Sequence, residues 1–326
     1  MLILSRREVM ELLTLDSCIE AVERAFRLHA EQQTFGPGVL GLPTEDGGFH
    51  IKAAGLRGDR NYFAAKTNGN FPNNARRFGL PTIQGTVVLA DASNGIPLAV
   101  MDSGSITMLR TAAATAVAAK YLARPDSRTA TVVGCGVQGE IQLAAIKAVL
   151  PLQRALLLDS DHARAEAAAA RATAHLGLRA EAAKDLRTAL RDSDVCVTCT
   201  PSRHAFVMAG DIAAGTFIAA VGADSQGKQE IDPALVASAT LVVDVVDQCA
   251  EIGELQHALA AGLMTRDQVH AELGDVVAGR RPGRTHRDEI TIFDSSGTAL
   301  QDVAAAIAVY EKARATGRGA EVKLDA

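Results

Sequence analysis

The sequence has only five cysteines, no long apolar run and no excess of positive charge, and each of these shortages excludes a class of protein. The cysteines are odd in number and scattered and follow no recognisable signal peptide, so we expect no disulfide framework and a reducing cytoplasm. The most apolar runs, such as 129–133 and 241–246, are too short to span a bilayer. A net charge of −5 gives no broad positive field, so we expect small-molecule ligands and no nucleic-acid partner.

The chain is long enough for two domains, because its 326 residues are 48% hydrophobic. Apolar residues recur at helical spacing over 5–33 with a break at 14–17, which predicts two helices, the second capped by Asp16 or Ser17. Short β-like runs separated by Gly, Asn and Pro turns then indicate an α+β module. These runs are 49–53, 62–67, 82–90 and 97–102.

A breaker-poor stretch, 105–122, predicts a buried helix that leads to a turn at Pro125, which we take as a domain boundary. Strands alternate with Ala-rich helical segments beyond it, as in a doubly wound parallel sheet. A final helix over about 296–317 is expected to pack on the first module. The predicted fold is therefore α/β, with a Rossmann-type domain over 125–295 and a discontinuous α+β domain over 1–124 and 296–326. The candidate strands of the sheet are 129–133, 155–159, 195–200, 217–221 and 241–245.

The segment 132–139 places a G-x-G-x-x-G motif directly after a predicted strand and at the start of a helix. Gly134 would permit a tight turn, Gly136 would let the backbone approach a pyrophosphate, and Gly139 would let the helix pack on the strand. The amino end of the helix offers unpaired N–H groups to the negative charge. Because a strand, a helix and a later acid accompany the motif, we predict a dinucleotide site.

Asp159, at the end of the next predicted strand, would accept hydrogen bonds from the adenosine ribose. A carboxylate there repels a 2′-phosphate, and 156–161 contains no arginine, so NAD is favoured over NADP. Arg164 follows closely and leaves NADP open.

Four ordered segments resemble the ornithine cyclodeaminase and mu-crystallin family: Arg-Thr-Ala-Ala at 110–113, the glycine loop at 134–139, Gly-Ala-Asp-Ser-Gln-Gly-Lys-Gln-Glu at 222–230, and Phe-Asp-Ser at 293–295. The resemblance runs from the strand of Lys66 to the final helix. It implies a homodimer with a substrate-binding and dimerisation domain built from both chain ends. It also implies hydride exchange at the α-carbon of an amino or imino acid.

The resemblance assigns roles to residues by position. Lys66 and Arg110 match the cations that hold the substrate carboxylate, Asp224 matches the acid/base residue beside the α-nitrogen, and Ser296 lies near the substrate. Both the glycine motif and the family resemblance assign Gly134, Gly136 and Gly139 to the cofactor site. The remaining implied cofactor residues are Thr82, Arg110, Thr111, Val137, Gln138, Asp159, Thr200, Val221, Gly222, Ala223, Lys228 and Ser295.

The chain departs from the family pattern in the carboxylate pocket. Many members carry an arginine in a segment like Pro-Pro-Arg, where this chain has Gly38. One strand later, Lys52 occupies a place where cyclodeaminases usually have an apolar residue. Lys52 would suit a substrate with a second carboxylate, such as iminosuccinate.

The chemistry needs a carboxylate clamp and one titratable group. Lys66 and Arg110 fit the clamp, since arginine binds carboxylate bidentately and lysine adds a point charge. Asp224 follows a predicted strand at the edge where open α/β sheets bind ligands, and a partly buried carboxyl there would exchange a proton near neutral pH. We expect the three side chains to share one cavity. The structural alternatives are a solvated strand face for Lys66, a salt bridge for Arg110 and a helix cap for Asp224.

No metal site is expected, because the eight histidines are dispersed and the Cys196-x-x-Cys199 pair stands alone. We interpret that pair as core packing along a central strand, with the two side chains on opposite faces.

The leading hypothesis is an NAD-dependent imine reductase or amino-acid dehydrogenase. One alternative is an ornithine or lysine cyclodeaminase, a lyase that recycles its NAD⁺ and releases ammonia. The other is a non-catalytic cofactor-binding protein like mu-crystallin.

Overall fold

The computed structural model describes residues 1–324, which form two compact units. Unit 1 comprises Met1–Arg110 and the carboxyl-terminal segment from Thr298, and unit 2 comprises Thr111–Gly297. The final helix therefore belongs with the amino-terminal module, although almost 190 residues separate them in the sequence. Within residues 1–324, no helix combines the length and the apolar character needed to cross a membrane.

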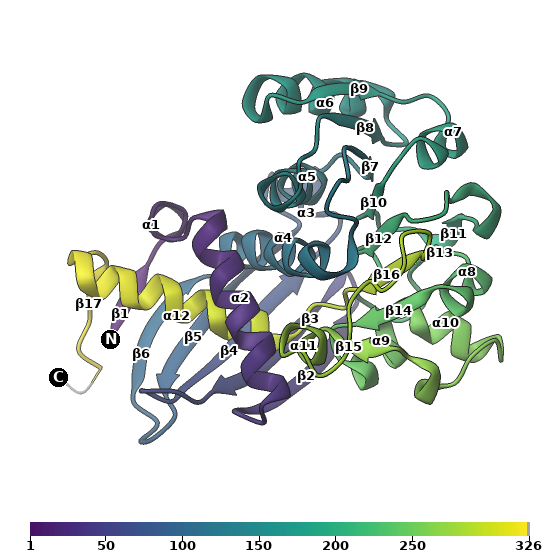
Figure 1. The fold of residues 1–326 in the computed structure, drawn as a ribbon. Helices are drawn as coiled ribbons and strands as arrows, with labels where there is room; N and C mark the ends of the chain where they lie inside the picture. Colours follow the sequence, from purple (N-terminus) through teal and green to yellow (C-terminus); the bar gives the residue numbers. More distant parts are fainter. Residues whose placement is uncertain (325–326) are drawn as a thin grey trace. The chain divides into compact units, whose positions relative to one another are not determined.

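Unit 1 is built on a seven-stranded sheet in the order β17-β1-β6-β5-β4-β3-β2, in which β2 to β6 form an antiparallel meander. Helix α12 packs against β3, β4 and β5, and α2 packs against α12 (Figure 1). The strands are β1 Leu2–Leu4, β2 Thr34–Thr44, β3 Gly47–Leu56, β4 Tyr62–Asn70, β5 Ile83–Asp91, β6 Pro97–Asp102 and β17 Ala320–Glu321; the helices are α1 Arg6–Leu12, α2 Leu15–Ala30, α3 Asn74–Phe78 and α12 Ala299–Thr316.

The two amino-terminal helices are confirmed, but the predicted cap of the second was wrong. Helix α2 is capped by Thr14, whose side chain accepts from the backbone N–H of Ser17, while Ser17 hydrogen-bonds back to Thr14. Thr14, Asp16 and Ser17 are all polar, and the reciprocal hydrogen bonds between Thr14 and Ser17 make Thr14 the cap.

Helix α12 is buried along most of its length, because small alanines at 304–306 let it lie close to the sheet. Gln301 and Asp302 are buried in the same helix. A buried polar pair in an apolar helix needs polar partners, which β4 and helix α4 (Ser103–Leu122) supply.

Unit 2 contains an eight-stranded parallel sheet in the order β15-β14-β16-β12-β10-β7-β8-β9, which confirms the predicted Rossmann-type architecture. The chain leaves β7 toward β8 and β9 on one side and continues from β10 toward β12 on the other. The topological switch point therefore lies between β7 and β10.

Helices connect most of these strands, and β11 and β13 form a separate two-stranded sheet (Figure 1). The strands of unit 2 are β7 Thr129–Val133, β8 Arg154–Leu158, β9 Arg179–Ala182, β10 Val195–Thr198, β11 Arg203–Val207, β12 Phe217–Ala220, β13 Gln229–Ile231, β14 Thr240–Val243, β15 Ala271–Glu272 and β16 Thr291–Asp294. Its helices are α5 Val137–Val149, α6 His162–Leu176, α7 Leu186–Arg191, η1 Ala209–Asp211, α8 Pro233–Ser238, α9 Val246–Ile252, α10 Leu255–Ala260, η2 Arg266–Gln268 and α11 Leu273–Val277.

Candidate active site

Unit 1 gathers three cations on the buried face of its sheet. Lys52 on β3 and Lys66 on β4 are cross-strand partners, with 8% and 3% of their surface exposed. Arg110 reaches the same place from α4 and is 5% exposed. We call Lys52, Lys66, Arg110 and their acidic neighbour Asp302 the cation cluster.

Asp302 joins the two cations predicted to clamp the substrate. Its Oδ1 atom lies 2.8 Å from Lys66 Nζ and 3.0 Å from Arg110 Nε. Arg110 Nη1 also donates to Gln301 Oε1 at 2.6 Å. Lys66 and Arg110, 44 positions apart in the sequence, are therefore held together by two consecutive residues of α12.

Lys66 and Arg110 share the one carboxylate of Asp302, so the positive charge of these two cations is in excess. Burial lowers the pKa of Lys66 to about 7, although Asp302 opposes the shift. Burial also pushes the pKa of Asp302 upward, but Lys66 and Arg110 outweigh it and hold that pKa below its usual range. The cluster is therefore suited to an additional anionic group.

Asp302 Oδ2 in the cluster is buried and lacks a hydrogen-bond partner among residues 1–324, and so does the amide nitrogen of the neighbouring Gln301. A buried amide donor without a partner is costly, and a ligand oxygen would satisfy it. Neither residue was found from the sequence, although a Gln-Asp pair inside an Ala-rich buried helix was a usable signal.

The glycine loop of unit 2 has the geometry that its motif predicts. Gly134 adopts a φ of +99°, which favours glycine, and a side chain at Gly139 would lie 2.0 Å from the Gly134 carbonyl oxygen. Gly136 caps α5 and has nothing within 4 Å of where a Cβ would stand. Gly134 and Gly139 are thus required by the fold, whereas Gly136 faces open space.

A cavity of about 590 Å³ lies over this loop, and we call it the dinucleotide cavity. Gly134 and Gly136, which follow β7, and Thr200, which follows β10, line it, so it opens at the topological switch point. Ligands bind at this position in open α/β sheets.

Asp159 lines the dinucleotide cavity and is fixed by backbone groups. Its carboxylate accepts from Cys135 N at 2.8 Å and from Asp161 N at 3.0 Å. Burial raises the pKa of Asp159, but these backbone hydrogen bonds outweigh it and lower the pKa overall. Arg164 Nη1 lies 3.8 Å away in the same cavity.

The remaining residues predicted for the cofactor have different surroundings. Val137 is exposed at the start of α5, whereas Val221, Gly222 and Ala223 are buried after β12. The Ser295 hydroxyl is buried and lacks a hydrogen-bond partner in the described chain. Gln138 and Lys228 are partly exposed, Thr111 is buried in α4, and Thr82 is exposed in unit 1 before β5.

The carboxyl of Asp224 differs from its expected environment. We expected partial burial, but the side chain is 55% exposed and its Oδ1 accepts from Lys228 Nζ at 2.6 Å. Asp224 follows β12 on a loop that continues to β13, without a helix to bury it. The predicted proton-exchanging group is thus accessible to a ligand.

Ser296 is fully buried in unit 2. Its hydroxyl donates to Asp244 Oδ1 at 2.6 Å and accepts from Gln248 Nε2 at 2.8 Å. These bonds fix the segment between β16 and α12, which carries Ser295 as well.

The interpretation of the Cys196-x-x-Cys199 pair needs a correction. Cys196 is buried on β10, as expected, but β10 ends at Thr198. Cys199 lies beyond the strand, lines the dinucleotide cavity and donates to the Gly134 carbonyl at 3.2 Å.

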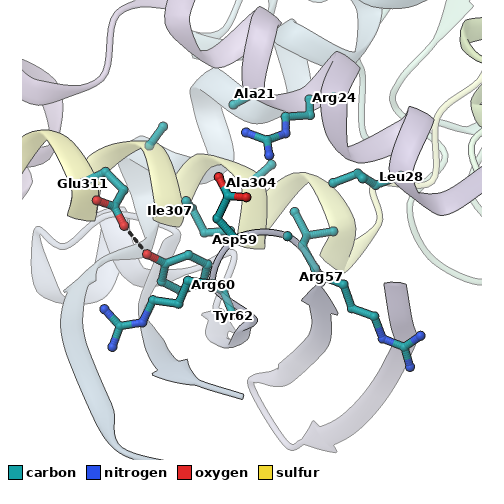
Figure 2. A pocket seen from close by; sticks show the side chains of 13 residues that line it. Ala21, Arg24, Leu28, Arg57, Asp59, Arg60, Tyr62, Ala304, Ile307 and Glu311 are labelled. Atoms are coloured by element: carbon teal, nitrogen blue, oxygen red, sulfur yellow. Dashed lines mark hydrogen bonds between the residues drawn. The ribbon is translucent and has the colours of Figure 1, made fainter. Parts of the chain in front are cut away.

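A second cavity, of about 460 Å³, lies in unit 1 and is lined by residues of α2, of α12 and of the segment that leads into β4. Figure 2 shows Tyr62 of β4 hydrogen-bonded to Glu311 of α12, with Arg24 and Asp59 pointing toward one another. The residues that line it include none of those predicted for the site. We therefore do not assign it to the reaction.

The chain is similar to proteins of one known family over nearly its whole length. Residues 1–317 match the model of the ornithine cyclodeaminase/mu-crystallin family. Iminosuccinate reductase of Paracoccus denitrificans is 38% identical and is aligned over 99% of this chain and all of its own.

Two solved structures share the fold over the full length. An archaeal alanine dehydrogenase dimer with bound NAD is 39% identical with a TM-score of 0.94, and 99% of each chain is covered. Thermococcus litoralis Delta(1)-pyrroline-2-carboxylate reductase, in complex with NADH and L-proline, is 34% identical with the same TM-score. This match covers 99% of the present chain and 100% of the reductase.

Proposed function

Because this chain belongs to the ornithine cyclodeaminase/mu-crystallin family, we propose that it is an NAD-dependent oxidoreductase acting on small α-amino and α-imino acids. The observation that carries the proposal is the cation cluster, in which buried Lys66 and Arg110 converge on one carboxylate and leave positive charge in excess. A substrate carboxylate would balance that charge. The enzymes compared above, an alanine dehydrogenase and two imine reductases by name, support this class of reaction.

We propose a division of labour between the parts of the chain. Residues 1–124 with 296–326 would bind the substrate, and residues 125–295 would bind NAD. The helix start at Gly136 and the carboxylate of Asp159 fit the pyrophosphate and the adenosine ribose. When bound, NAD supplies or accepts the hydride at the substrate α-carbon.

The residues of the chain would supply binding and proton transfer. Arg110 and Lys66 would hold the carboxylate, with Gln301 Nε2 as an additional donor. Asp224 would donate a proton to the imine nitrogen in the reductive direction and remove one in the oxidative direction. When the substrate binds, the ion pair between Asp224 and Lys228 would break, or the Asp224 carboxylate would contact both Lys228 and the substrate nitrogen.

The cofactor is NAD in this proposal. The carboxylate of Asp159 is held in place by two backbone N–H groups, so it is not free to turn away from a 2′-phosphate. Arg164 contacts the same carboxylate and keeps weaker use of NADP open.

Lys52 points to a substrate with two carboxylates. It is buried on the same sheet face as Lys66, and its charge lowers the pKa of both Lys66 and Asp302. A dicarboxylate such as iminosuccinate would bring a second negative charge that Lys52 would attract.

We also propose that the protein is a homodimer. The sheet face opposite α12 presents an apolar row of Ala53, Ala65, Val88 and Val100 in register, and Val88 is 37% exposed. A second copy of the chain would cover this row.

The five cysteines are free, which supports our proposal of a reducing cytoplasm.

An NADH oxidation assay tests the function. Purified protein, NADH and ammonia are mixed with pyruvate, glyoxylate or oxaloacetate, and the NADH absorbance is followed. We expect turnover with at least one oxo acid. The lyase alternative instead predicts ammonia and proline from ornithine, or pipecolate from lysine, without net NADH. The binding-protein alternative predicts NADH binding without any turnover.

A further inference from the structure

The side chain of Glu230 connects two loops at the edge of the dinucleotide cavity. Its Oε1 atom accepts from the backbone N and the hydroxyl of Thr200, each at 2.7 Å. Its Oε2 atom accepts from Gly222 N at 2.9 Å. Thr200 follows β10 and Gly222 follows β12, so one fully buried carboxylate holds the carboxyl ends of two neighbouring strands together.

The backbone at Glu230 is itself held by hydrogen bonds. It lies on β13, which pairs with β11, and its backbone N donates to Glu254 Oε1 at 2.7 Å. Glu254 Oε2 accepts from the next backbone N, that of Ile231, at 3.3 Å. The Glu230 carboxyl is thus anchored and has little freedom to move away from the loops.

The fit around Gly222 is tight. A Cβ at this position would lie 2.4 Å from Glu230 Cδ and 2.4 Å from the Thr200 carbonyl oxygen. The absence of a side chain at Gly222 therefore lets the two loops and the carboxyl come into direct contact.

Keeping this carboxyl buried is energetically costly. No ion pair joins Glu230 to a cation within residues 1–324, and burial raises its pKa. A fully buried acid without a cation is rare, and hydrogen bonds must offset the cost of burying it. All three bonds described above go to the loops that carry predicted cofactor residues and Asp224.

We propose that Glu230 is a positioning residue that holds the Thr200 and Gly222 loops in the geometry that receives NAD and presents Asp224. This inference rests on the proposed function, since it concerns the same cofactor. It assigns a role to the last residue of the 222–230 segment, for which the sequence suggested none.

The test is a direct titration of NADH by fluorescence on the full-length protein. Glu230→Gln keeps the shape but places an amide N–H₂ where a loop N–H or hydroxyl now donates. We expect the Kd for NADH to rise about tenfold or more, as loss of charge-assisted hydrogen bonds predicts. Glu230→Asp keeps the charge on a shorter side chain and should raise the Kd less.

Glu289→Gln is the matched control. Glu289 also accepts from one hydroxyl and two backbone N–H groups, those of Thr240, Thr285 and His286, but at the amino ends of β14 and β16. Its Kd should stay within about twofold of wild type even where the melting temperature falls.

The outcomes separate the two proposals. Wild-type affinity for NADH in Glu230→Gln, or an equal loss in Glu289→Gln, overturns the positioning role. If Glu230→Gln does not fold, an unchanged Kd in Glu230→Asp overturns it and a weakened Kd supports it. Failure of the wild-type protein to bind NADH would overturn the proposed function instead.

Discussion

Lys52 and Lys66 face each other across neighbouring antiparallel strands, both buried and both on the side of the sheet that packs against α12. Like charges directly opposite in a sheet repel each other. Asp302 forms an ion pair with Lys66 but is shared with Arg110. A negatively charged ligand beside Lys66 and Arg110 would therefore add an attraction that Asp302 alone divides between them.

Replacing Lys52 should affect dicarboxylic substrates selectively. We expect Lys52→Ala to lower kcat/KM for oxaloacetate with ammonia by roughly 10- to 100-fold, the effect of losing a buried charge-assisted contact. The value for pyruvate with ammonia should change little. The exposed Lys312→Ala in the same unit serves as control and should alter neither value. Equal losses for both substrates would show that Lys52 does not recognise a second carboxylate.

Carboxylate binding should weaken as pH rises through neutrality. Burial lowers the pKa of Lys66 from 10.5 to about 7, so the folded protein loses this charge above pH 7. The inhibition constant of an unreactive monocarboxylate, measured between pH 6 and 9, should rise by up to about tenfold per pH unit above 7. In Lys66→Met the inhibition constant should be higher than in the wild type and independent of pH in this range. A flat wild-type profile would contradict the assignment.

The same pKa shift has an effect of defined sign on stability. Between pH 7 and 10.5 the unfolded chain keeps the Lys66 proton that the folded chain has released. Burial of the protonated Lys66 therefore lowers the free energy of unfolding most below pH 7. This penalty diminishes as the pH rises from 7 to 10.5.

Two glycines of the loop should separate folding from cofactor binding. Gly139→Ala would place a Cβ 2.0 Å from the Gly134 carbonyl, so we expect a markedly lower melting temperature. Gly136→Ala has open space and an ordinary φ of −79°, so its stability should be nearly unchanged while the Kd for NADH rises. Circular dichroism melts and NADH titrations measure the two effects. The reverse pattern would refute the cofactor role of Gly136.

Asp159 should set the cofactor preference. Asp159→Ser removes the charge that repels a 2′-phosphate and leaves Arg164 in the cavity. We expect the ratio of kcat/KM for NADH over NADPH to fall by about tenfold or more. Because Asp159 also binds Cys135 N and Asp161 N, the melting temperature is measured in parallel. An unchanged ratio would show that Asp159 does not discriminate between NADH and NADPH.

The parts of the fold that could be predicted from the sequence are those with local signals. The glycine loop and the strands β7, β8, β10, β12 and β14 follow from apolar runs and turns, whereas the short β9 and β15 carry no such run and were not predicted. Strand β2 was missed because Gly36, Gly38 and Gly41 with two prolines resemble a loop, yet the strand pairs along β3. Tertiary pairing overrode the local preference.

The site was predictable only as far as its residues carry sequence signals of their own. Lys66 and Arg110 could be named, but their shared partner Asp302 lies on a helix 236 positions after Lys66 in the sequence. The exposure of Asp224 depends on how its loop runs to β13, which no periodicity encodes. Glu230 was visible as a residue, but its contacts with Thr200 and Gly222 exist only in the folded sheet.

The most direct test of the central claim follows the hydride itself. NADH deuterated at both C4 positions is incubated with ammonia and the oxo acid that the protein reduces, and the amino acid formed is examined by mass spectrometry and NMR. We predict one deuterium at the α-carbon, and no labelled product from Asp224→Asn, which should still bind NADH. An amino acid whose α-hydrogen comes from water, or binding of NADH without reduction of any oxo or imino acid, would contradict the account.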